Sequence, residues 1–165
     1  KYSRSISRTL LYDISLKYSR KDFYNPNEDK NSDAYELSNK LSYVNKDYGF
    51  FLGEVVLADE KRIRGTRTDV SKEYYFLKLS NIYKYTPTLL LNTNINHENY
   101  QYKYTDVNFL NKREDKKTSY SFGVTNINSK QLTLNTSAQY IENKSNQAPF
   151  AYDKYVLKSS VNYNF

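Results

Sequence analysis

Residues 10–18 read Leu-Leu-Tyr-Asp-Ile-Ser-Leu-Lys-Tyr, and this stretch contains the pattern that decides the fold. From Leu10 to Tyr18 every second residue is apolar or aromatic, and Asp, Ser and Lys lie between them from Tyr12 onward. Successive side chains of a β-strand point to opposite faces of a sheet. The alternation therefore predicts a strand with one apolar face and one polar face.

The same alternation recurs along the chain, whereas helical spacing is rare. It predicts eight strands, around residues 10–18, 35–43, 49–58, 75–83, 89–96, 120–124, 132–140 and 155–165. The parity of the third strand is ambiguous. Placing Val55 and Leu57 on its apolar face puts Glu54 on the polar one. All three Pro lie between strands, as expected because Pro cannot donate to a β-ladder.

Long and short connections alternate between these strands. The long ones cover about residues 21–33, 59–72, 98–115 and 142–152, and the short ones lie at 45–47, 85–87 and 128–130. In an antiparallel meander this order places every long loop at one end, as in bacterial outer-membrane barrels. We expect an all-β antiparallel up-and-down transmembrane β-barrel that forms one domain over residues 1–165.

A soluble barrel with its apolar face inward would alternate equally well. The polar face of this chain is too rich in charged residues for a dry core, but it suits a wet interior. The residues expected to line that interior are Lys17, Lys40, Glu54, Lys78, Lys117 and Lys158.

Tyr residues lie at the ends of the apolar runs. The chain holds 19 Tyr and 8 Phe but no Trp, although only 38% of its residues are hydrophobic and its mean hydropathy is −0.87. Tyr combines an apolar ring with a polar hydroxyl and is enriched where membranes meet water. The expected aromatic girdle comprises Tyr18, Tyr43, Tyr83, Tyr140, Tyr155 and Tyr163.

The last predicted strand, residues 155–165, has aromatic or apolar residues at alternate positions and ends in Phe165. It resembles the terminal signal that the barrel-assembly machinery recognises in outer-membrane proteins. The resemblance implies an assembly signal at Tyr163 and Phe165 and a location in the outer membrane of a Gram-negative bacterium.

Composition excludes several kinds of site. The absence of Cys excludes disulfides and thiolate chemistry, and a single His97 excludes any site with two imidazoles. His97–Glu98 is interpreted as a strand-rim pair rather than a catalytic one. Four scattered Gly cannot build a phosphate loop. We therefore expect no enzyme activity, no catalytic residues, no metal and no cofactor.

The formal net charge is +7, with 25 Lys and Arg against 18 Asp and Glu. The charged run Lys112–Lys117 and the acidic pairs Asp59–Glu60 and Glu114–Asp115 are expected in long loops. Basic loop residues would contact lipopolysaccharide phosphates. Nucleic-acid binding is not expected, because the Lys and Tyr residues do not gather on one strand face.

Four short segments resemble the C-terminal barrel of the surface lipoprotein assembly modulator family. They are Tyr102–Asp106, Lys112–Lys116, Tyr140–Asn146 and Ala151–Lys154, which lead into the terminal Phe strand. The resemblance implies a barrel of about fourteen strands, of which this chain would be the C-terminal part. It also implies delivery of lipoproteins or other proteins to the cell surface. Lys1 in place of Met agrees with a processed or C-terminal chain.

Two functions stay open at this point. The first is a porin-like conduit or translocation barrel, with surface lipoproteins as cargo. The second is a self-contained eight-strand barrel that acts as a structural or adhesive surface protein without a conducting pore. Conductance of the purified chain distinguishes the two functions.

Overall fold

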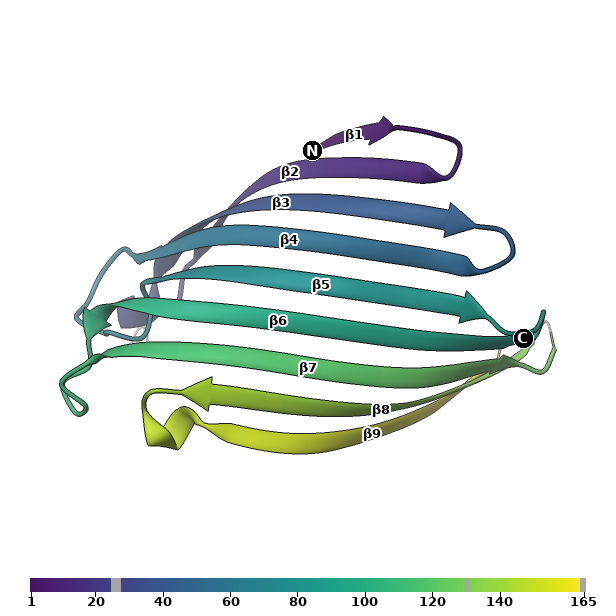
Figure 1. Cartoon of the computed structure of the whole chain (residues 1–165). Coiled ribbons are helices and arrows are strands. Elements are labelled where there is room, and N and C mark those ends of the chain that lie inside the picture. Colours follow the sequence, from purple (N-terminus) through teal and green to yellow (C-terminus); the bar gives the residue numbers. More distant parts are fainter. Residues whose placement is uncertain (25–27, 130, 164–165) are drawn as a thin grey trace.

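The computed structural model describes residues 1–24, 28–129 and 131–163. These residues form one antiparallel sheet of nine strands, each paired with its neighbours along the chain (Figure 1). The strands are β1 (Tyr2–Ser5), β2 (Leu10–Lys21), β3 (Ser32–Asn45), β4 (Gly49–Arg62), β5 (Lys72–Lys84), β6 (Leu89–Thr105), β7 (Lys112–Ile127), β8 (Leu132–Ser145) and β9 (Tyr152–Tyr163). The predicted all-β up-and-down fold is confirmed.

The predicted number of eight strands is wrong, because β1 precedes the first predicted strand in the described residues. The eight predicted strands correspond to β2–β9. Strand β1 has four residues that pair with Leu11–Ile14 of β2. A segment this short contains too few residues for alternation to reveal it.

The alternation of long and short connections is confirmed. Residues 22–31, 63–71, 106–111 and 146–151 connect the strands at one end of the sheet, and 6–9, 46–48, 85–88 and 128–131 connect them at the other (Figure 1). We call these the long-loop end and the short-turn end. The long-loop end also carries two single-turn 3₁₀ helices, η1 (Glu28–Lys30) and η2 (Ala148–Phe150).

The predicted lengths of the long loops are wrong, because the strands continue into them. Lys112–Lys117 and Glu114–Asp115 lie in β7, and Asp59–Glu60 lies in β4. Beyond the apolar band both faces of a strand are polar, so the alternation stops although the backbone ladder goes on. In this region Glu98 pairs with Lys117, and Tyr100 with Asp115.

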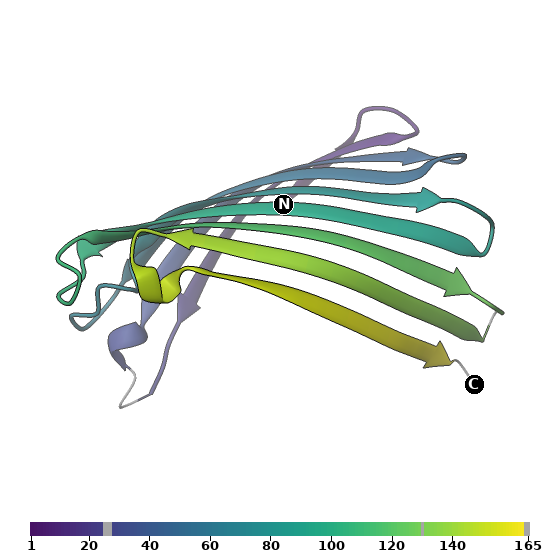
Figure 2. The same ribbon diagram turned by 60° about the horizontal axis from the view of Figure 1, so that its bottom comes forward.

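The two faces of the sheet differ sharply in burial. On the apolar face Leu16 is 80% exposed and Leu157 is 82% exposed, whereas on the polar face Asp13 is 5% and Glu60 is 4% exposed. A single-layer sheet buries side chains only where its curvature brings them together. The polar face is therefore the concave side of the curved sheet in Figure 2, and the apolar face is convex.

The sheet does not close in the described residues. Its two outer strands are β1 and β9, and no pairing between them is present. Strand β1 covers only residues 11–14 of β2, so the long-loop half of β2 is also an edge. A closed barrel is thus not part of this structure, although the curvature and strand order are compatible with one. Among residues 1–24, 28–129 and 131–163, no helix is long and apolar enough to cross a membrane.

Candidate functional site

The polar face brings together the residues predicted to line an interior. Strand register places Lys40 opposite Glu54 and Glu54 opposite Lys78. Lys17 on β2, Lys117 on β7 and Lys158 on β9 project from the same face, because the side chains of register partners lie on one side of a sheet. The six predicted residues therefore share one concave wall.

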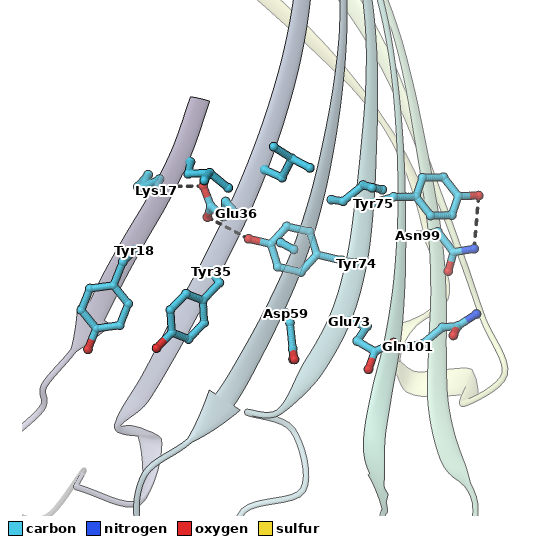
Figure 3. A pocket seen from close by; sticks show the side chains of 14 residues that line it. Lys17, Tyr18, Tyr35, Glu36, Asp59, Glu73, Tyr74, Tyr75, Asn99 and Gln101 are labelled. Carbon is cyan, nitrogen blue, oxygen red and sulfur yellow. Dashed lines mark hydrogen bonds and ion pairs between the residues drawn. The ribbon is translucent and has the colours of Figure 1, made fainter. Parts of the chain in front are cut away.

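One polar chain on this wall links three strands near the long-loop end. Lys17 Nζ donates to Glu36 Oε2 at 3.1 Å, and Tyr74 Oη donates to Glu36 Oε1 at 2.9 Å. Figure 3 shows this chain running from β2 through β3 to β5. Tyr74 reaches over β4, whose residue Ala58 lies between the two partners in register. The small Ala58 side chain leaves room for this contact.

Glu60 on β4 is a buried carboxylate of the wall that contacts three polar side chains. Its Oε1 accepts from Lys21 Nζ at 2.7 Å and from Ser32 Oγ at 2.6 Å, and Lys72 Nζ lies 3.5 Å from Oε2. Only 4% of Glu60 is exposed. The sequence prediction missed this residue because it assigned Asp59–Glu60 to a loop.

Toward the short-turn end, strands β6, β7 and β8 carry a ladder of neutral polar side chains. Asn96 Nδ2 donates to Ser119 Oγ at 3.2 Å, and Asn92 Nδ2 donates to Thr125 Oγ1 at 3.0 Å. Thr125 in turn donates to Asn135 Oδ1 at 2.8 Å. Asn, Ser and Thr side chains thus bond to one another across the strands, although Asn96 Oδ1 is buried without a hydrogen-bond partner among the described residues. This part of the wall is polar through neutral groups.

Ion pairing along the wall is uneven. Lys117 Nζ forms an ion pair with Glu98 Oε1 at 3.3 Å, and Lys40 Nζ forms one with Asp13 Oδ2 at 3.5 Å. Lys78, Lys154 and Lys158 have no acidic ion-pair partner among residues 1–24, 28–129 and 131–163. Positive charge without an ion-pair partner in the described part of the chain therefore lies on β5 and on β9.

The predicted girdle residues all lie on the apolar face, near one or the other end of their strands. Tyr18, Tyr140 and Tyr155 lie toward the long-loop end, and Tyr43, Tyr83 and Tyr163 lie toward the short-turn end. Two of these rings pack together across β8 and β9, because Tyr140 and Tyr155 are register partners with ring centroids 4.9 Å apart. Tyr163 is the last residue of β9, and Phe165 lies outside the described residues.

A regular spacing separates the two groups of rings. On three strands the Tyr residues of a pair are eight positions apart, namely Tyr35 and Tyr43, Tyr75 and Tyr83, and Tyr155 and Tyr163. At about 3.4 Å per residue this is about 27 Å along the strand. With the tilt of about 40° usual in membrane barrels, the height becomes about 20 Å, close to their apolar band of about 25 Å.

A cluster of loops and aromatic rings covers the long-loop end of the polar face, and the sequence prediction did not anticipate it. The Arg113 guanidinium lies 3.4 Å from the centroid of the Phe150 ring and 4.8 Å from that of Tyr102. Arg113 Nε also donates to Asp115 at 2.8 Å. A cavity of ≈350 Å³ lies beside these residues, between the 63–71 and 106–111 loops. Stacking on arginine therefore fixes the loops to the strands.

The 63–71 loop has its own ion pair. Arg67 contacts Asp69 with two of its nitrogens, and Asp29 lies 4.0 Å from Arg67 Nε. The hydrogen bond from Arg67 lowers the pKa of the Asp69 carboxyl below its ordinary value. This ion pair joins two residues of the same loop, and the contact to Asp29 links the loop to η1.

His97 and Glu98 are adjacent in β6 and point to opposite faces. His97 Nδ1 lies 2.9 Å from Thr118 Oγ1, and the ring packs 5.9 Å from Tyr75 on the apolar side. Glu98 Oε2 accepts from Tyr100 Oη at 2.6 Å on the polar side. The two side chains therefore do not form an acid–imidazole pair. Their expected place at the end of a strand is also wrong, since β6 continues to Thr105.

In comparisons with known proteins, the chain matches no protein-family model, no curated protein and no solved structure. The resemblance to the surface lipoprotein assembly modulator family stays a prediction.

Proposed function

We propose that this chain forms the wall of a transmembrane β-barrel in a bacterial outer membrane. The observation that carries the proposal is the inverted burial of the sheet, with leucines exposed on the convex face and carboxylates buried on the concave one. Water on the convex face would make those leucines costly, at about 25 cal/mol for each Å² of apolar surface. Lipid against the same face removes that cost.

The orientation follows from the connections. Outer-membrane barrels turn their short connections to the periplasm and their long loops to the outside. The cluster around Arg113 and Phe150 would then lie at the outer mouth. Backbone groups at the edges of β2 and β9 would need partners inside the membrane, because lipid offers none. Closure of the barrel is therefore part of the proposal.

The biochemical role we propose is a conduit without enzyme activity, through which surface lipoproteins are candidate cargo. Lys78, Lys154 and Lys158, which have no acidic ion-pair partner among the described residues, would favour anions modestly. The rival role is a structural or adhesive barrel without an open pore. The ion pairs around Glu60 and Glu36 support this second role, because a small closed barrel would be filled by such side chains.

A tryptophan placed on either face tests the membrane assignment. The chain has no Trp, so all tryptophan fluorescence of a variant comes from the one introduced indole. Leu79, midway between Tyr75 and Tyr83, points to the convex side, and Lys78 points to the concave side. After refolding into vesicles with brominated acyl chains, Leu79→Trp should be strongly quenched and Lys78→Trp weakly. Equal quenching, or none in either variant, would contradict the assignment.

Planar-bilayer recording separates the two roles. A conduit should give discrete conductance steps with a reversal potential on the anion side. The double variant Lys154→Glu/Lys158→Glu should move that potential toward cations, since both side chains lie on the concave wall. A silent protein that still passes the quenching test would support the structural barrel.

A further inference from the structure

A broad hollow lies on the convex face of the described residues, near the long-loop end. Its volume is ≈760 Å³, and it spans β2 to β6 (Figure 3). The floor is made by Leu16, Leu37 and Leu57, which are register partners on three adjacent strands. Tyr18 and Tyr35 stand at one side, and Tyr75 stands at the other. We call this hollow the girdle groove.

A gap in the row of aromatic rings produces the girdle groove. Strand β3 carries Tyr35 and strand β5 carries Tyr75, but β4 between them has no ring at this level. Its residues there are Asp59, opposite Tyr35, and Leu57, opposite Tyr75. The shorter side chains of β4 leave a groove between the Tyr35 ring of β3 and the Tyr75 ring of β5. A ring at position 57 would close it.

The polarity of the girdle groove changes along the strand. Toward the middle of the sheet the surface is made of leucines. Toward the loops Lys103 contacts both Asp59 and Glu73, and Lys61 Nζ lies 3.5 Å from Asp59. Lys103 and Lys61 thus offset the two carboxylates. The Lys61 side chain is 66% exposed, so its amine is still accessible to a ligand.

The strand that forms the gap continues into a basic run. Residues 61–67 contain Lys61, Arg62, Arg64 and Arg67 and no acidic residue. This run lies directly beyond the polar end of the girdle groove. The groove therefore has an apolar half, and its polar end, where Lys61 and Lys103 lie beside Asp59 and Glu73, borders the basic run. This is the order in which an anionic lipid would place its acyl chain and its headgroup.

We propose that the girdle groove binds one lipopolysaccharide molecule of the outer leaflet. An acyl chain lies over Leu16, Leu37 and Leu57, and a phosphate group meets the amine of Lys61 at the beginning of the basic run. This proposal rests on the proposed function, because it places the long-loop end at the outer membrane surface. The volume suits the occupant, since ligand sites commonly hold about 300–1,000 Å³.

The experiment uses the full chain refolded in detergent without bacterial lipid and then mixed with Kdo2-lipid A, the smallest phosphate-bearing form of the ligand. Native mass spectrometry measures the bound fraction. Leu57→Trp closes the gap and Lys61→Ala removes the amine. The matched control Leu79→Trp adds the same ring on the convex face of β5, outside the groove.

The wild type and Leu79→Trp should bind Kdo2-lipid A with equal affinity. Leu57→Trp should bind it about tenfold more weakly, because the acyl chain of the lipid loses buried CH₂ contacts. Lys61→Ala should bind Kdo2-lipid A less tightly than the wild type does. Its binding of diacylglycerol, which carries no phosphate, should equal that of the wild type. Equal binding by Leu57→Trp overturns the groove, and an unchanged Lys61→Ala overturns the phosphate contact. Equal wild-type affinity for both lipids overturns the choice of lipopolysaccharide. Bromolipid quenching of the two Trp variants shows separately whether the proposed membrane function holds.

Discussion

Tyr18 on β2 and Tyr35 on β3 are register partners whose ring centroids lie 5.1 Å apart, with an angle of 42° between the ring planes. Tyr18 Oη also donates to Asp33 Oδ1 at 2.7 Å. Each ring therefore has an apolar side against its neighbour and a hydroxyl at the polar end of the strands. This geometry suits the boundary between hydrocarbon and headgroups.

A double-mutant cycle measures that contact. Tyr18→Leu and Tyr35→Leu should together show a coupling of about 1 kcal/mol in the free energy of unfolding, as expected for a packed aromatic pair. Urea titration in micelles gives the values. Tyr18→Leu combined with Tyr83→Leu, at the short-turn end of β5, serves as control and should be additive. A coupling near zero between Tyr18 and Tyr35 would show that the rings do not stabilise each other.

The assignment of the faces predicts a large loss of stability at one residue of β2 and almost none at the next. Ile14 lies on the convex face, and Ile14→Arg should lower the free energy of unfolding in a bilayer by about 2–4 kcal/mol. Ser15→Arg, on the concave face, should change it by less than about 1 kcal/mol. Vesicle-refolded protein titrated with guanidinium chloride provides the comparison. Similar losses in both variants would mean that lipid does not cover the convex face alone.

The turn between β3 and β4 depends on Gly49, whose φ is +103°. A Cβ at this position would lie 2.0 Å from the carbonyl oxygen of Ile82. Gly49→Ala should therefore cost about 2 kcal/mol or more in unfolding free energy. At Gly53 the nearest atom would be Leu79 Cδ2 at 3.7 Å, so Gly53→Ala should be neutral or slightly stabilising. If both variants behave alike, the strain at Gly49 is not significant.

The carboxylate of Glu60 holds two lysines and one serine together. Glu60→Gln leaves Lys21 and Lys72 beside a neutral group and should cost about 2 kcal/mol, the range of hydrogen bonds to charged groups. Urea unfolding in micelles measures the loss. Glu73→Gln is the control, because 65% of the Glu73 side chain is exposed and screening weakens its ion pair. If both variants lose the same unfolding free energy, the ion pairs of Glu60 contribute no more than an exposed ion pair does.

Much of this fold can be predicted from the sequence because one face of each strand is apolar. From Leu10 to Tyr18, and again from Tyr75 to Tyr83, the alternation alone identifies strand and face. The predicted lining residues Lys17 and Lys158 project from the face to which this parity assigned them. The pattern fails where both faces are polar, as at Asp59–Glu60 and Lys112–Lys117, because pairing there is set by the backbone of neighbouring strands.

By itself, the sequence determined the strand order, the two faces and the end at which the long loops gather, since each follows from the period of two and from connection length. Tertiary structure decided which residues meet. Register placed Tyr74 over Ala58 to reach Glu36, and it left β4 without a ring between Tyr35 and Tyr75. Such contacts join residues that are far apart in the chain. Local periodicity contains no information about them, because only strand register and sheet curvature bring those side chains together.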